Sequence, residues 1–361
     1  MTRLSLRTLN RTTLHRQSLL ERSTRPTTEI IEHLVGMQAQ NPNDPYWALW
    51  SRVVDFDVAD LADMISKREA VRGQLMRATI HLVTTRDFLT LRPQMDPVCA
   101  RTLRSTVFSK DTKHVDRSNL LAEGRSLLDP RPMTRAELGP LLAEVWPDAP
   151  AASLAQVVTY LLPVVQVPPR GIWKQTGPAA WATIEKWAGA SPDMRSDPQR
   201  TVHRYLAAFG PASIADMRVW SGLPGLREVV AGMRGQLTTY EDEDGRELLD
   251  LPDLHIVDED TPAPPRFLPE YDNLLLGHAD RSRFFLPGVI PQGWSGNLLV
   301  DGLFTGAWKT SRAKAGSSLT IDLMRAITKL ETTQLMEEAE RLLVFTFPDA
   351  EHSEITLRHL T

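Results

Sequence analysis

Residues 201–230 read TVHRYLAAFGPASIADMRVWSGLPGLREVV, and this stretch decides the fold. Its apolar residues recur at helical spacing up to Gly210, and Pro211 cannot continue a helix. Ser213 is suited to capping a short second helix. The pair Ser221-Gly222 then predicts a turn into a third helix. Short helices joined by tight turns in this order predict a helix-turn-helix.

A hairpin follows these helices. Residues 235–251, GQLTTYEDEDGRELLDL, hold two strand-like runs around Asp244-Gly245, a favoured turn pair. The same order of helices and a strand-rich hairpin occurs twice earlier, in residues 27–84 and 132–177. This order is typical of winged helix-turn-helix modules, although a generic helical bundle with hairpins also fits it. We therefore expect an α+β protein that contains three such modules.

The pattern changes near residue 262. Four prolines lie between residues 262 and 269 and cannot sustain a helix. Beyond them the sequence shows several strand-like runs and one helical run, at residues 332–345. The chain is therefore expected to divide into winged-helix modules at 1–100, 101–195 and 196–262 and a β-rich C-terminal domain at 263–361.

Composition limits the class of protein. The single cysteine, Cys99, excludes an internal disulfide and suits a reducing cytoplasm. No apolar run is long enough to span a bilayer. The Arg-rich start looks like a transit peptide, but we favour an amphipathic first helix built on Leu4, Leu14 and Leu19. The net charge of −4 is uneven, because residues 1–125 carry 19 Lys and Arg against 14 Asp and Glu, so one face suits a polyanion.

Two glutamines, Gln38 and Gln40, stand between a helical run and a proline. Gly36 is placed to end the helix, and Pro42 pushes the preceding residue into an extended conformation. Side chains two residues apart in an extended chain point the same way, so both glutamines are expected to face one space. Asp44, the nearest carboxylate, is interpreted as the N-cap of the following helix.

A pair of neutral amides has two interpretations. They are loop amides that satisfy backbone groups, or they hold and polarise a water molecule. An amide cannot remove a proton at neutral pH. The second interpretation therefore requires a substrate that is already activated for departure.

Five stretches together give the chain a resemblance to a known family. They are LNRTTLHRQSLLERS at 9–23, VGMQAQNPNDPYWALWSRV at 35–53, MRATIHLVTTRDF at 76–88, YLAAFGPASIADMRVWSGL at 205–223 and LPEYDNLLLGHADRSRF at 268–284. In this order they resemble the AlkZ-type tandem winged-helix DNA glycosylases. The resemblance covers most of the chain. It implies three winged-helix modules in a C-shaped arrangement around a concave DNA-binding face, with a β-rich, barrel-like C-terminal domain.

The resemblance also implies a catalytic signature, Q-x-Q or Q-x-D, matched here by Gln38-Ala39-Gln40. The all-amide form resembles the branch of the family that protects antibiotic producers from their own DNA-damaging product, such as azinomycin. These enzymes unhook bulky or interstrand-crosslink lesions. A monofunctional glycosylase is implied, which releases N7-alkylguanine from double-stranded DNA through a water held by Gln38 and Gln40, without metal or other cofactor. The expected setting is the bacterial cytoplasm at the nucleoid, and three modules in one chain favour a monomer.

Basic side chains are expected to contact DNA phosphates without reading sequence. The candidates for DNA contact are Arg7, Arg11, Arg16, Arg72, Arg77, His81, His278 and Arg281. In the motif at 271–283, Asp272, Asn273, His278, Asp280 and Arg281 are expected to support the groove, with DNA contact by His278 or Arg281 as the less favoured option. For His81 a satisfied strand histidine is favoured over a groove-lining role, and the alternative for the arginines is that they solvate the surface. The alternative function is a non-enzymatic winged-helix regulator or a protein that sequesters the drug.

Overall fold

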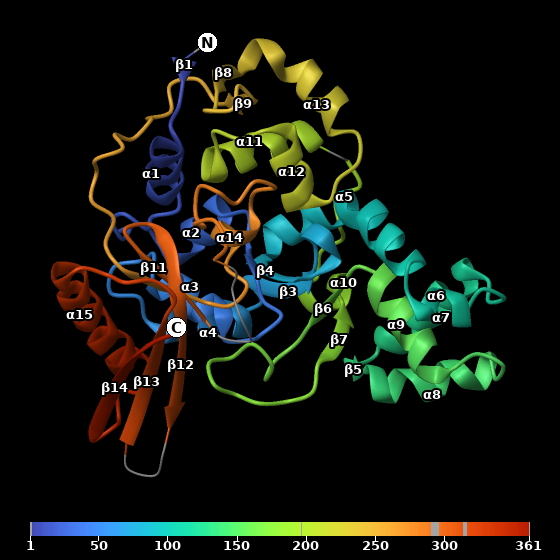
Figure 1. Ribbon diagram of the computed structural model, residues 1–361. Helices are drawn as coiled ribbons and strands as arrows, with labels where there is room; N and C mark the ends of the chain where they lie inside the picture. The colour runs from blue at the N-terminus through green and yellow to red at the C-terminus, as the bar shows by residue number, and fades with distance from the viewer. Residues whose placement is uncertain (1, 196, 290–295, 313–315, 361) are drawn as a thin grey trace.

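The computed structural model describes residues 2–195, 197–289, 296–312 and 316–360. Helices and strands occur along the whole chain, and the fold is of the mixed α+β class (Figure 1). One order of elements, namely helix, short strand or bridge, helix, helix and hairpin, occurs three times. This is the order of a winged helix-turn-helix, as predicted.

The first module carries the glutamine pair. Its elements are α2 (Thr27–His33), β2 (Met37–Gln38), α3 (Asp44–Trp50), α4 (Val58–Ser66), β3 (Ala70–Gln74) and β4 (Ile80–Thr84). Strand β4 pairs antiparallel with both β2 and β3. A 3-10 turn, η1 (Met76–Ala78), closes the hairpin between β3 and β4.

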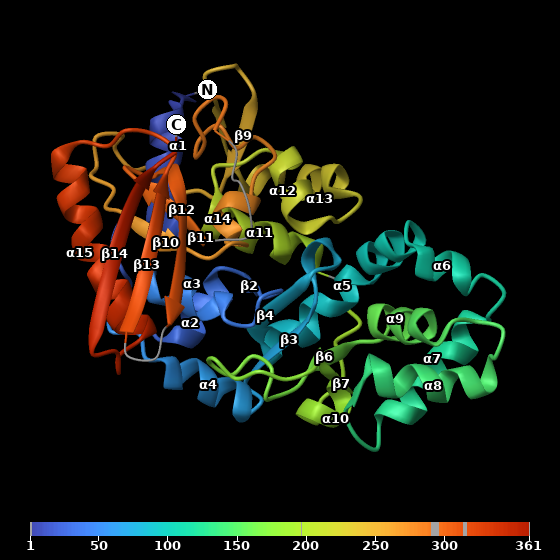
Figure 2. The same cartoon turned by 60° about the horizontal axis from the view of Figure 1, so that its bottom comes forward.

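The second module follows α5 (Thr85–Arg104) and α6 (Val107–Asp111). Its elements are α7 (Arg117–Leu128), β5 (Met133–Thr134), α8 (Arg135–Val145), α9 (Ala151–Leu161), β6 (Val164–Gln166) and β7 (Ala180–Thr183). Thr134 and Glu137 form a reciprocal capping box that begins α8. Helices α6 to α9 project to one side of the molecule in both views (Figures 1 and 2).

The third module follows α10 (Ile184–Ala188). Its elements are α11 (Pro198–Phe209), α12 (Ile214–Ser221), α13 (Leu226–Met233), the 3-10 turn η2 (Arg234–Gln236), β8 (Thr238–Glu241) and β9 (Glu247–Asp250). As predicted, α11 ends at Gly210, Ser213 caps α12, and Gly222 turns into the next helix with φ +78°. The bridge between Ala212 and Leu249 takes the place of the short strand.

The first two modules share one sheet. Its strand order is β2-β4-β3-β6-β7-β5, and β3 of the first module pairs antiparallel with β6 of the second. The boundary expected at residue 100 lies inside α5. The predicted first helix is α1 (Leu6–Arg16), and β1 (Thr2–Arg3) before it pairs with β8 of the third module. The start of the chain is therefore bound to the third module.

The C-terminal region is β-rich but is not a barrel. Its strands are β10 (Arg266–Leu268), β11 (Gly296–Val300), β12 (Leu303–Arg312), β13 (Gly316–Leu323) and β14 (His352–His359). They lie in the order β10-β11-β12-β13-β14, and in the described residues β10 and β14 form two open edges. Helix α15 (Lys329–Thr346) contacts β13 and β14. The expected barrel-like closure was therefore wrong.

This C-terminal sheet also supports the first module. Phe267, Leu298 and Trp308 of the sheet share one buried apolar cluster with Met37 and Leu82 of the first module. The short helix α14 (Asn273–Leu276) lies between β10 and β11 in sequence. The segment around the glutamines is therefore packed on one side against the C-terminal sheet.

Candidate active site

The glutamine segment lies on an edge strand. Gln38 pairs with His81 across β2 and β4, and the ladder continues as Ala39 N donates to Ile80 O at 2.7 Å. The strand ends before Gln40, which lies in a bend. The predicted extended conformation is therefore confirmed for the first part of the Q-x-Q segment and ends within it.

Two long-range side chains hold the backbone of this segment. Asn273 Nδ2 donates to Gly36 O at 2.7 Å, and Arg72 Nη2 donates to Ala39 O at 2.6 Å. Arg72 is 1% exposed, and burial lowers its pKa to about 9. It cannot reach a DNA phosphate, so its prediction as a DNA contact was wrong. It supports the residue between the two glutamines.

Gly36 is required by both its backbone and its neighbours. Its φ is +89°, and a Cβ there would lie 2.3 Å from Val83 Cγ1. We expect Gly36→Ala to lower the free energy of unfolding by about 2 kcal/mol or more, measured by urea denaturation. Gly235→Ala is the control, since a Cβ at Gly235 meets nothing within 4 Å. Equal stability of the two variants would contradict this prediction.

Gln40 is exposed and lines a cavity of about 520 Å³ between the first two modules. Three more glutamines, Gln74, Gln156 and Gln166, line the same cavity, with Arg135 and Arg170 and the rings of Tyr160 and Trp181. Neither Asp nor Glu occurs among the lining residues in the described part of the chain. The volume is in the range of small-ligand sites, and the lining is neutral or cationic.

Some polar atoms of this cavity lack partners within the protein. Gln74 Oε1 and Gln166 Oε1 are buried and accept no hydrogen bond from the described residues, and Arg170 Nε donates none to them. Arg135 Nε donates to Thr159 Oγ1 at 2.8 Å, and its guanidinium lies 5.0 Å from the ring of Trp181. The cavity thus offers both acceptors and donors to an occupant.

Gln38 has a different environment from Gln40. It is 5% exposed and is not among the described residues that line the cavity. Its Oε1 accepts a hydrogen bond from Arg77 Nη2 at 2.7 Å. The two glutamines therefore have different surroundings: Gln38 binds Arg77, whereas Gln40 lines the cavity. The structure does not show both side chains lining one cavity.

Asp44 was wrongly interpreted as a helix cap. Asn43 occupies the N-cap position of α3, and no side-chain capping bond forms there. Asp44 is 2% exposed, and its Oδ2 has no partner among the described residues. Burial raises its pKa to about 8, and the charges of Glu270 and Asp272 add to the shift. Asp44 is therefore a neutral acid at pH 7.

The two candidate histidines are buried and neutral. His81 is 0% exposed, its pKa is lowered to about 3 by burial and by Arg77, and Nδ1 lies 3.0 Å from Thr79 O. His278 is 1% exposed, burial lowers its pKa to about 3, and Nε2 lies 3.0 Å from Phe209 O. Neither side chain can contact DNA in this structure, so DNA contact was wrong for both, and the favoured alternative of a buried structural histidine fits both.

The N-terminal arginines bind carboxylates of the protein itself. Arg16 forms a buried double ion pair with Asp250, at 2.7 and 2.8 Å. Arg11 is 0% exposed and pairs with Asp301. Burial removes both from contact with phosphate, so these two predictions were wrong. Arg7 is partly exposed, but it too donates to Asp301, at 2.8 Å.

The motif at 271–283 is largely structural support, as expected. Asp272 forms a buried ion pair with Arg52 at 2.7 Å, and Asp280 pairs with Arg246. Arg281 is exposed and close enough to Arg77 to lower the pKa of that guanidinium. Among the eight predicted DNA contacts, Arg281 is thus an exposed cation near Arg77, the hydrogen-bond partner of Gln38.

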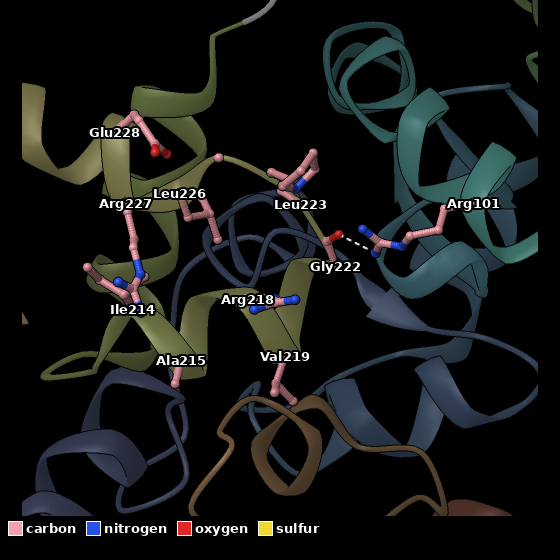
Figure 3. A pocket seen from close by; sticks show the side chains of 12 residues that line it. Arg101, Ile214, Ala215, Arg218, Val219, Gly222, Leu223, Leu226, Arg227 and Glu228 are labelled. Atoms are coloured by element: carbon pink, nitrogen blue, oxygen red, sulfur yellow. Dashed lines mark hydrogen bonds between the residues drawn. The ribbon is translucent and has the colours of Figure 1, made fainter.

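Two exposed arginines were missed in the sequence. Arg218 and Arg227 line a hollow of about 950 Å³ at the turn between α12 and α13 (Figure 3). Neither has an ion-pair partner within the described ranges. Their positions on the second and third helices of a helix-turn-helix were a usable signal, because this motif contacts DNA in many proteins.

The residues that the structure describes contain no group of three or more His, Cys, Asp or Glu side chains placed to hold a metal ion. A helix with the length and apolarity needed to cross a membrane is also not found in this part of the chain.

A family model described as "DNA glycosylase AlkZ-like" matches residues 31–345, which is most of the chain. The chain therefore belongs to the AlkZ-like DNA glycosylase family, as the sequence resemblance implied. It is a DNA-repair enzyme that acts on DNA, and the alternative of a non-enzymatic regulator is set aside.

One solved structure has the same fold over the whole chain. The Streptomyces sahachiroi DNA glycosylase AlkZ superposes with a TM-score of 0.73 and 19% identity, covering 99% of this chain and 100% of that one. At this identity the likeness concerns the fold. No curated protein matches the sequence.

Proposed function

We propose that this glycosylase hydrolyses the N-glycosidic bond of N7-alkylguanine in duplex DNA, with a water held by Gln38 and Gln40. The observation that carries the proposal is the all-amide Q-x-Q segment beside a cavity whose described lining has no carboxylate. Amides hold a water in place but do not ionise it. Such a site suits a leaving group that needs no protonation.

The charge of the lesion supplies the activation. Alkylation at N7 leaves a positive charge on the purine, so the C1′–N9 bond breaks with its electron pair moving to the base, which leaves neutral. The sugar gains oxocarbenium character, the water oxygen bonds to C1′, and the water's proton passes to solvent. The products are the free base and an abasic site. An unmodified purine, which would leave as an anion, is expected to stay in place.

Bulky and crosslinked lesions fit the same scheme. A guanine tethered to the opposite strand cannot rotate fully out of the duplex, as many glycosylase substrates do. The cavity at Gln40 is open to solvent between two modules, so an adduct need not be enclosed. We therefore propose that the chain, acting as a monomer, unhooks interstrand crosslinks and protects against DNA-alkylating antibiotics of the azinomycin kind.

A base-release assay tests the reaction. Duplex DNA with a single 7-methylguanine, and a second duplex with an N7–N7 crosslink, are incubated with the protein in the presence of EDTA. Free 7-methylguanine and alkali-labile abasic sites are expected from the first duplex, and separated strands from the second. Release from neither duplex at high enzyme concentration would reject the lesion assignment while leaving the family assignment in place.

DNA binding is expected to use Arg218 and Arg227. Each contact to a phosphate contributes through counterion release. Alanine at either position should weaken binding equally for unrelated duplex sequences and lower the slope of log K against log salt by about 1. Fluorescence anisotropy at several salt concentrations measures both effects. Arg312→Ala, on the C-terminal sheet and paired with Asp349 at 2.7 Å, is the control and should leave the slope unchanged.

A further inference from the structure

The turn between β3 and β4 places one guanidinium against the proposed catalytic strand. Arg77 lies in this turn in the left-handed region, with φ +56°, and Ala78 follows with φ +57°. Such backbone is uncommon for residues other than glycine and marks a constrained turn. It directs the Arg77 side chain away from its own hairpin toward two other parts of the protein.

The guanidinium joins these two parts. Nη2 donates to Gln38 Oε1 at 2.7 Å, and Nη1 donates to Trp220 O at 2.5 Å. Trp220 belongs to the last turn of α12 in the third module. Close by, Arg101 Nη2 of α5 donates to Gly222 O at 2.6 Å, a contact drawn in Figure 3. Both arginines therefore bind the carboxyl end of α12, whereas Arg77 also holds a glutamine.

The contact fixes which end of the Gln38 amide is free. Its oxygen accepts from the Arg77 cation, which fixes the oxygen end of the amide and leaves the two N–H groups of Nε2 as the donors that it can offer. The described residues give Nε2 no acceptor, while the oxygen has a charge-assisted bond. A guanidinium bound to the oxygen also draws electron density from the amide and makes its N–H groups better donors.

Arg77 remains charged at neutral pH. Burial and Arg281 lower its pKa to about 10, which still leaves the guanidinium protonated at pH 7. His81, the cross-strand neighbour of Gln38, has a pKa of about 3 because of burial and Arg77. The histidine is therefore neutral, and Arg77 is the cation that acts on Gln38.

We infer that Arg77 is a positioning residue: it holds Gln38 as a hydrogen-bond donor and leaves the role of acceptor to Gln40. The inference rests on the function proposed above. A water that accepts a hydrogen bond from Gln38 Nε2 keeps one lone pair free for C1′ and can donate a proton to an acceptor such as the Gln40 amide oxygen. The same guanidinium ties this arrangement to α12, so the third module helps to set the geometry of the first.

Two arginine variants separate positioning from structural support. Arg77→Met removes both contacts, and Arg101→Met removes only a contact to α12. Single-turnover rates at saturating enzyme, on duplex DNA with 7-methylguanine, are measured beside DNA affinity. We expect Arg77→Met to slow base release by about tenfold or more, with affinity changed less than threefold, and Arg101→Met to stay within twofold of the parent rate. Equal losses in both variants would overturn the inference.

A double variant tests whether Arg77 acts through Gln38. Gln38→Ala combined with Arg77→Met should be no slower than Gln38→Ala alone, because the partner is already absent. Losses that multiply would overturn the inference. If Gln38→Ala is slow while Arg77→Met is fully active, this inference fails and the proposed reaction stands. If Gln38→Ala is fully active, the glutamine assignment fails and this inference fails with it.

Gln38→Glu is a second variant that keeps Arg77 in place. A carboxylate retains the bond to the guanidinium, now as an ion pair, but it has no N–H to donate. If Gln38 acts as a donor, Gln38→Glu should release the base at least about tenfold more slowly than the parent. Its thermal stability should equal or exceed that of the parent. An active Gln38→Glu enzyme would show that the donor is not needed and would overturn the inference.

Discussion

Gln40→Ala is expected to slow release of 7-methylguanine by about 100-fold at saturating enzyme, because it removes an acceptor for the attacking water. Gln40 is exposed and lines the cavity, so its truncation leaves no buried void. Thermal stability should therefore stay within about 0.5 kcal/mol of the parent protein. Single-turnover kinetics with a denaturation curve on the same preparation measure both quantities.

Gln199→Ala is the matched control for this prediction. Gln199 is an exposed glutamine on α11 and does not line the cavity. It should release the base at the parent rate. A Gln40→Ala enzyme that works as fast as this control would remove Gln40 from the mechanism, whatever the outcome at Gln38.

Asp44→Asn should produce the largest change in stability. The folded pKa of Asp44 is raised to about 8 by burial, above the ordinary value of 3.8. A raised carboxyl pKa gives stability that is fully present below pH 4 and is lost as the pH rises to about 8. Asparagine resembles the neutral acid but does not titrate, so the variant does not lose this stability between pH 4 and pH 8. The free energy of unfolding of the variant should therefore exceed that of the parent increasingly as the pH rises, by about 4 kcal/mol at pH 7 and about 5 kcal/mol at pH 8.

Urea denaturation at pH 4.5 and pH 8 measures this gain. Groups that do not interact with Asp44 affect both proteins alike, so the difference between variant and parent reports Asp44 together with its neighbours Glu270 and Asp272. Asp148→Asn, at an exposed position, is the control for the chemical change from carboxyl to amide. A pH-independent difference at Asp44 would mean that its carboxyl is ionised in the folded protein at pH 8.

Local signals explain why the module order could be predicted from the sequence. The ends of α11 and α12 depend on Gly210, Ser213 and Gly222, whose effects on the backbone extend over only a few residues. The Q-x-Q strand was likewise recognisable, since Gly36 has a positive φ and the strand follows it directly. Neither prediction required knowledge of distant partners.

The burial and the ion-pair partners of the arginines could not be predicted from such local signals. Arg16 looked like a free cation beside other arginines, but its partner Asp250 is 234 residues away in sequence. Arg72 lies on a strand that also faces the second module, and its burial depends on that contact. Spacing within a segment carries no information about such pairs. The cavity at Gln40 was missed for the same reason, because Gln156 and Gln166 come from another module.

The sheet shared by the first two modules limits how the enzyme can move. The pairings of Arg72 with Gln166 and of Gly73 with Val165 would have to break before a hinge could open between these modules. Opening there would expose unpaired strand edges, and the free-energy cost makes such opening rare. The two walls of the cavity are therefore held in a fixed position relative to each other. The DNA duplex, and not the protein, must therefore bend to bring a lesion to Gln40. Lesions that make the duplex easier to bend should be bound in preference to others.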